Sequence, residues 1–225
     1  MLDRFLRYVK IHTTSDPDND EVFPSTEREF DLAHLLVQEL KDLGIEDAKV
    51  DEKCVVYATV PANLSPENAS KVATLCFNAH LDTAPSESGK NVQPQIHNFT
   101  GTDILISKEP EIIVKAESIP NSKSYLGTQF VSGVGTTLLG ADDKAGIAEI
   151  MTAIDFLQEH PDIKHGELKI VFSPDEEIGR GAKAVDVENL GADWGYTIDG
   201  SAMGELEYEC FNAANGSITI QGYNV

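Results

Sequence analysis

The feature that most limits the possible folds is an apolar run, Val72 to Phe77, which leads into a histidine and an aspartate. A strand that is buried on both faces of a sheet reads as a continuous apolar run. Such strands favour an α/β fold, in which ligands bind beyond the carboxyl ends of the strands. His80 and Asp82 stand at this end of the predicted strand. Imidazole ligates zinc well, and a carboxylate often holds its other ring nitrogen, so the pair is compatible with a metal site.

Three later segments also carry carboxylates where a strand or loop ends. Asp142 and Asp143 precede the helical pattern 147–157, the β-rich run 168–172 leads to Ser173-Pro-Asp-Glu-Glu177, and the run 194–198 leads to Asp199. Repulsion among so many acidic groups in one cleft would be costly without a cation. The joint placement therefore predicts a metal site.

Each segment alone has a simpler interpretation. His-x-Asp is more often a polar strand end, and Asp142-Asp143 suits a helix cap. Residues 175–177 resemble a solvated acidic turn, and Asp199-Gly200 a turn dipeptide. Only their shared position after β-rich segments favours the metal interpretation. The residues themselves leave open which of Glu176 and Glu177 binds a metal and which acts as a base.

Several longer motifs make a family resemblance visible. The sequence resembles the peptidase T group, the tripeptide aminopeptidases of the two-zinc M20 metallopeptidase family. The motifs that carry this resemblance nearly end to end are Pro24-Ser-Thr-Glu27, His80-Leu-Asp-Thr83, the segment Ser88 to Ile96, the segment Thr137 to Met151, Pro174-Asp-Glu-Glu177, Gly181-Ala-Lys183, Gly204-Glu-Leu-Glu207 and Phe211-Asn-Ala-Ala214.

The resemblance implies a role for each site residue. His80 and Asp199 would bind the first zinc, Asp142 would bridge both zincs, and Glu177 would bind the second. Asp82 would orient His80, and Glu176 would be the general base that takes a proton from the attacking water. The resemblance further implies a cis peptide bond between Asp142 and Asp143. The expected substrates are tripeptides, from which the N-terminal residue is released.

The same resemblance implies an incomplete domain organisation. We expect a three-layer α/β zinc-peptidase catalytic domain with a mostly parallel mixed sheet over residues 1–214. Residues 215–225 would be the start of an inserted lid or dimerisation domain, with its first strand at 217–221. Members of the family supply a final histidine ligand after that domain. The isolated chain is therefore expected to hold one zinc at most and to be nearly inactive, and the complete protein is a candidate homodimer.

Composition narrows the partners and the compartment. The formal net charge is −21, which argues against nucleic acid and anionic membranes as partners. Cys54, Cys76 and Cys210 form no Cys-x-x-Cys pair and predict reduced thiols in a cytoplasmic protein. The first ten residues are too charged for a signal peptide and predict an amphipathic helix. No stretch is long and apolar enough to span a bilayer.

Local patterns give the remaining elements. Thr26 and Glu29 form a capping-box pattern for a helix that runs to Leu43 and is closed by Gly44. Strands are expected at 48–50, 55–60 and 111–116, and a polar loop at 61–70.

Two other functions stay open: a non-catalytic metal- or peptide-binding protein, and a related M20 carboxypeptidase or deacylase. No Gly-x-Ser-x-Gly elbow of a serine hydrolase is present, and Gly140 to Gly146 carries acids where a phosphate-binding loop needs donors.

Overall fold

The computed structural model describes residues 1–200, 204–209, 214 and 216–223. Its α-helices are α1 (Leu2–Tyr8), α2 (Glu29–Asp42), α3 (Pro66–Ala69), α4 (Ala141–Glu159), α5 (Gly181–Ala184) and α6 (Val187–Leu190). Its strands are β1 (Lys49–Val50), β2 (Val56–Val60), β3 (Leu75–His80), β4 (Gln95–Asn98), β5 (Ile104–Lys108), β6 (Glu111–Val114), β7 (Gln129–Ser132), β8 (Leu168–Ser173) and β9 (Trp194–Thr197). Two 3-10 turns, Ala116–Ser118 and Ser122–Tyr125, precede β7.

A five-stranded sheet in the order β1-β2-β8-β3-β9 forms the centre of the fold. The sheet is mixed, as predicted, but it is not mostly parallel, because two of its four strand pairs are parallel and two are antiparallel. Its central strand β3 pairs in parallel with both β8 and β9, whereas β1 and β2 join through antiparallel pairs. Parallel pairing is thus confined to the half of the sheet whose strand ends carry the predicted site residues.

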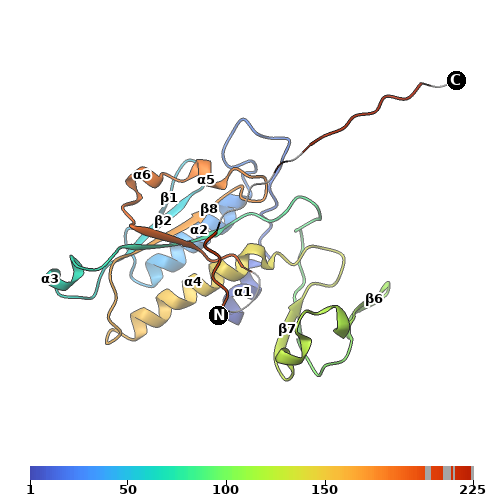
Figure 1. Ribbon diagram of the computed structural model, residues 1–225, viewed down its shortest axis with the longest axis horizontal. Helices are drawn as coiled ribbons and strands as arrows, with labels where there is room; N and C mark the ends of the chain where they lie inside the picture. Colours follow the sequence, from blue (N-terminus) through green and yellow to red (C-terminus); the bar gives the residue numbers. More distant parts are fainter. Residues whose placement is uncertain (201–203, 210–213, 215, 224–225) are drawn as a thin grey trace.

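Helices cover both faces of this sheet and give three layers (Figure 1). On one face, side chains of α1, α2 and α4 pack against alternate residues of the strands, such as Ala58, Ile170 and Phe172. On the other face, Val171 and Cys76 pack with Ala184 of α5. Only the second half of the predicted apolar run lies in β3, where Cys76 is buried and Leu75 and Phe77 are partly buried, whereas Val72 precedes the strand and is 46% exposed.

The predicted helices and main-sheet strands are confirmed, with small differences at their ends. The N-terminal helix buries Tyr8, and α2 ends before Gly44, whose φ of 85° suits glycine after a helix. The capping box differs in detail, because the Thr26 hydroxyl donates to the Glu29 carboxylate at 3.2 Å. The predicted loop at 61–70 contains the short helix α3, which starts with Pro66 at its first position.

Residues 95–132 form two small antiparallel pairs, β4 with β7 and β5 with β6, which lie beside the main sheet (Figure 1). The predicted strand at 111–116 is β6. The predicted strand at 217–221 is not observed, because these exposed residues run away from the body of the fold and have no neighbouring strand to complete their hydrogen bonds. Residues 211–213 of the last family motif and Cys210 lie outside the described residues.

No helix in the described part of the chain is long and apolar enough to cross a membrane.

Candidate metal centre

His80 is the last residue of β3, and Asp82 contacts its imidazole at Nδ1. The side chains of both residues are buried, with exposed fractions of 1% and 0%. Nδ1 of His80 lies 3.0 Å from the main-chain oxygen of Asp82 and 3.2 Å from its Oδ1. Two acceptors at Nδ1 hold a ring proton there, so that loss of the other proton would leave the lone pair of Nε2 free for a metal.

Nε2 of His80 faces three carboxylates from three different segments. It lies 2.8 Å from Oδ1 of Asp142, 3.7 Å from Oδ2 of Asp199 and 3.8 Å from Oε2 of Glu176. One ligand atom each from His80, Asp142 and Asp199 lies within 4.8 Å of the others. The Asp142 side chain is 68% exposed, so the group opens to solvent above a buried imidazole.

The start of α4 supplies both Asp142 and a second, buried aspartate. The Asp142–Asp143 peptide bond is cis, as the resemblance implies, and both residues have non-helical backbone angles. Oδ2 of Asp143 accepts the main-chain N–H of His80 at 3.1 Å, and Oδ1 accepts the N–H of Gly146 at 3.2 Å. Asp143 therefore joins the start of α4 to the end of β3.

Asp82 also contacts the acidic segment that follows β8, residues 175–177. Its Oδ1 accepts the main-chain N–H of Glu176 at 2.9 Å, and its Oδ2 accepts that of Glu177 at 3.1 Å. One buried carboxylate thus fixes the imidazole and both glutamates relative to one another. All three partners face Asp82 with N–H groups, and its two carboxylate oxygens accept from them.

The acidic groups alter one another's protonation. Burial alone would lower the pKa of His80, but the carboxylates of Asp82, Asp143 and Asp142 outweigh it and raise this pKa to about 10. Burial and the Asp199 carboxylate raise the pKa of Asp143 to about 8. Burial, followed by the Asp142 carboxylate, raises the pKa values of both Glu177 and Asp199. Each carboxylate thus makes its neighbours harder to ionise.

These residues fit a divalent cation. The donor set is one imidazole nitrogen and several carboxylate oxygens, which suits zinc and other divalent metals. A cation would relieve the repulsion among the carboxylates, and the contact of Asp82 with Nδ1 is the usual arrangement behind a ligating histidine. His80, Asp142 and Asp199 are therefore a candidate metal-binding group.

The structure brings the predicted site residues to one edge of the sheet. His80, Asp142, Asp199 and Glu176 converge at Nε2 of His80. Glu177 is not part of the group of ligand atoms around Nε2, and its main-chain N–H donates to Oδ2 of Asp82. Sequence reasoning missed the contact of Asp143 with the main chain of His80. Its position next to Asp142 was the available signal.

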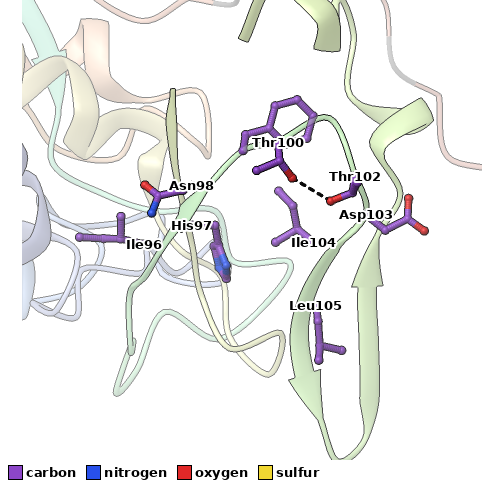
Figure 2. Close-up of a pocket in the computed structure, with 9 residues that line it drawn as sticks. Ile96, His97, Asn98, Thr100, Thr102, Asp103, Ile104 and Leu105 are labelled. Carbon is purple, nitrogen blue, oxygen red and sulfur yellow. Dashed lines mark hydrogen bonds between the residues drawn. The ribbon is translucent and has the colours of Figure 1, made fainter. Parts of the chain in front are cut away.

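A separate cavity of about 420 Å³ lies among the small strands (Figure 2). Its lining includes His97, Thr100, Thr102 and Asp103, and the two threonine hydroxyls form a hydrogen bond at 3.0 Å. None of the predicted site residues lines it, so this cavity belongs to the small strands and not to the metal centre.

Comparisons with known proteins show what the chain is similar to. The chain is 51% identical over 226 aligned residues to curated proteins named Peptidase T from Alkaliphilus oremlandii and Geobacillus thermodenitrificans. Each alignment covers 100% of this chain and 54% of the relative, so the chain spans about half the length of these relatives. No family model matches the chain.

Solved structures give the same result for the fold. The crystal structure of aminopeptidase PepT from Bacillus cereus matches with a TM-score of 0.61 and 26% identity, over 89% of this chain and 43% of that one. An M20 family metallo-carboxypeptidase from Sulfolobus solfataricus matches with a TM-score of 0.52 and 19% identity, over 89% of this chain and 37% of that one. By its sequence the chain is a relative of peptidase T, and its fold is similar to those of aminopeptidase PepT and of the M20 family metallo-carboxypeptidase.

Proposed function

We propose that this chain carries the zinc-binding part of the active site of a tripeptide aminopeptidase. The observation that carries the proposal is the convergence of Asp142, Asp199 and Glu176 on Nε2 of His80, with Asp82 behind the ring. The relatives named Peptidase T, and a Staphylococcus aureus tripeptidase whose structure matches with a TM-score of 0.61 and 26% identity over 89% of this chain and 43% of that one, support the reaction and the substrate class.

In this proposal, His80 and Asp199 would hold a first zinc, Glu177 would hold a second, and Asp142 would contribute to both. When bound, two divalent ions polarise the scissile carbonyl and make a water molecule acidic enough to attack near neutral pH. Glu176 accepts the proton of that water and passes it to the leaving amine, which its position 3.8 Å from Nε2 of His80 supports. Asp82 fixes the positions of the imidazole and the two glutamates relative to one another through its hydrogen bonds with all three.

The Glu176 side chain is 52% exposed, and its charged surroundings suit a general base. Desolvation raises its pKa most. His80 lowers this pKa, and the carboxylates of Asp199 and Asp82 raise it further. A base whose pKa is raised towards neutral holds an abstracted proton better than an ordinary carboxylate does. A homodimer of the complete protein and a cytoplasmic location belong to the same proposal. The buried free thiols of Cys54 and Cys76 support a reducing compartment.

The test combines metal content with hydrolysis on one sample of the 225-residue chain. Zinc per chain is measured by mass spectrometry, and release of products is followed for tripeptides, dipeptides and N-acyl amino acids. Glu176→Gln should abolish tripeptide hydrolysis and leave bound zinc unchanged, whereas Glu159→Gln, at the exposed end of α4, should change neither.

Other outcomes would overturn parts of the proposal. Hydrolysis of dipeptides or N-acyl amino acids without tripeptides would favour the carboxypeptidase or deacylase alternative. Bound zinc without turnover is the result expected of the isolated chain, and it would favour the metal-binding protein only if it persisted in a longer protein that contains this chain. A chain without affinity for zinc would contradict the metal centre itself.

A further inference from the structure

Three consecutive main-chain N–H groups after β8 donate to buried carboxylates. The N–H groups of Glu176 and Glu177 donate to the two oxygens of Asp82. The N–H of Asp175, one residue earlier, donates to Oε2 of Glu29 at 3.2 Å. The acceptors come from distant parts of the chain, so the acidic segment is held from two sides.

Glu29 is itself fixed in place. It is the first residue of α2, it is 0% exposed, and its Oε1 accepts the Thr26 hydroxyl at 3.2 Å. The Asp175 side chain returns the contact, because its two oxygens accept the N–H of Ser25 at 3.1 and 2.9 Å. The start of α2 and the acidic segment thus hold one another through reciprocal main-chain contacts.

Asp175 needs such support because of its backbone. Its φ of 57° lies in the left-handed region, which costs a residue with a Cβ more than it costs glycine. This angle turns the chain between the end of β8 and the two glutamates. A contact that fixes the N–H of Asp175 therefore also sets the direction in which Glu176 and Glu177 leave the strand.

We propose that Glu29 is a positioning residue for the metal centre: by holding the N–H of Asp175, it keeps Glu176 and Glu177 directed towards His80 and Asp142. This role rests on the proposed metal-dependent function and adds a residue that lies outside the predicted ligand set. A purely structural Glu29 would stabilise the start of α2 without affecting the two glutamates.

The protonation of Glu29 suggests the best conservative variant. Burial, followed by the carboxylates of Asp82 and Asp175, raises the pKa of Glu29 to about 9, so its side chain is neutral near pH 7. Glutamine has the same length, is also neutral and keeps one acceptor oxygen. Glu29→Gln should therefore preserve the contact with the N–H of Asp175, and Glu29→Ala removes it. Glu29→Asp shortens the side chain by one methylene and so moves the acceptor oxygen away from this N–H.

Amide hydrogen exchange of the metal-free chain tests the positioning directly. In Glu29→Ala and Glu29→Asp, the N–H groups of Glu176 and Glu177 should exchange about fivefold faster or more. Each rate is corrected for the change in global stability, which the most protected amides of β3 and β8 report. Glu29→Gln should exchange like the wild type. Leu36→Ala removes a buried side chain from the same helix and should leave the corrected rates at 176 and 177 unchanged.

A titration with Co²⁺ tests the consequence for the metal centre. Glu29→Ala and Glu29→Asp should bind Co²⁺ about tenfold more weakly or more, with an altered visible spectrum, whereas Glu29→Gln and Leu36→Ala should match the wild type. Unchanged exchange at 176 and 177 in a folded Glu29→Ala or Glu29→Asp variant would overturn the inference. A wild type that binds no Co²⁺ would instead overturn the proposed metal site, and the exchange rates would still decide the role of Glu29.

Discussion

At the scale of single residues, Asp82 has the widest reach in the site. It contacts the imidazole two residues away and the main chain of two glutamates more than ninety positions later. All of these partners donate hydrogen bonds to it. A single side chain therefore links the end of β3 to the end of β8.

Replacing the Asp82 carboxylate should lower both the stability of the fold and the affinity for Zn²⁺. In Asp82→Asn one acceptor oxygen becomes an NH₂ group that faces a donor, so a buried N–H loses its partner. We expect the unfolding free energy to fall by about 1–3 kcal/mol and the affinity for Zn²⁺ to fall about 10- to 100-fold. Urea unfolding and metal competition on the same preparation measure the two effects. Asp193→Asn, at the exposed N–H contact with Thr74, is the control and should change Zn²⁺ affinity little.

Glu29 gives a prediction about pH. Its pKa rises from 4.5 to about 9 on folding because of burial and the neighbouring carboxylates of Asp82 and Asp175. The folded state therefore holds the proton more tightly than the unfolded state does. This contribution to stability is complete below about pH 4.5 and is lost as the pH rises towards about 9.

The wild type should accordingly lose stability relative to Glu29→Gln by up to about 1.4 kcal/mol per pH unit between about pH 5 and about pH 8. Urea unfolding of both proteins at several pH values measures the difference, in which other titrating groups cancel. Parallel stability curves for the two proteins would show that Glu29 does not take up this proton on folding.

At the scale of secondary-structure elements, the close approach of α4 to the end of β9 determines the site. A Cβ at Gly146 would lie 1.9 Å from the main-chain oxygen of Ile198 and 2.4 Å from Oδ1 of Asp143. Glycine is therefore required where the helix crosses the chain that leads to Asp199. This contact sets the distance between two of the proposed ligands.

Gly146→Ala should push α4 and the segment at Ile198 apart. We expect a loss of about 1–3 kcal/mol in unfolding free energy, as for other overpacked interiors, together with weaker Zn²⁺ binding. Gly195→Ala, on β9 itself, is the matched control, because its Cβ would meet nothing closer than Cys76 at 4.0 Å. Thermal unfolding and metal titration compare the two, and equal behaviour would contradict the close approach.

These elements also show what the sequence could and could not predict. Strands β3 and β8, helix α4 and the residues that follow them were predictable, because burial on both faces and helical periodicity leave a local signature. The contacts of Asp82 with residues 176–177 and of Glu29 with Asp175 were not, since they depend on how distant segments meet. The strand at 217–221 failed for a related reason: a strand pattern needs a neighbouring strand to pair with.

At the scale of the whole molecule, metal binding should stabilise the fold, because the proposed ligands come from β3, α4, the acidic segment and the chain after β9. A ligand at one hundred times its dissociation constant adds about 2.7 kcal/mol, which corresponds to about 5–10 °C in a chain of this size. Calorimetry with Zn²⁺ and then with excess chelator measures the shift. His80→Ala should abolish it, and a shift that persists in this variant would place the ion elsewhere.

The exposed edge of the sheet has a consequence for assembly. β9 pairs with β3 on one side, and all four of its residues are exposed. An edge strand with free main-chain groups accepts another strand, and whatever pairs here arrives within two residues of Asp199. Pairing at this edge would therefore place added main chain beside one of the proposed metal ligands.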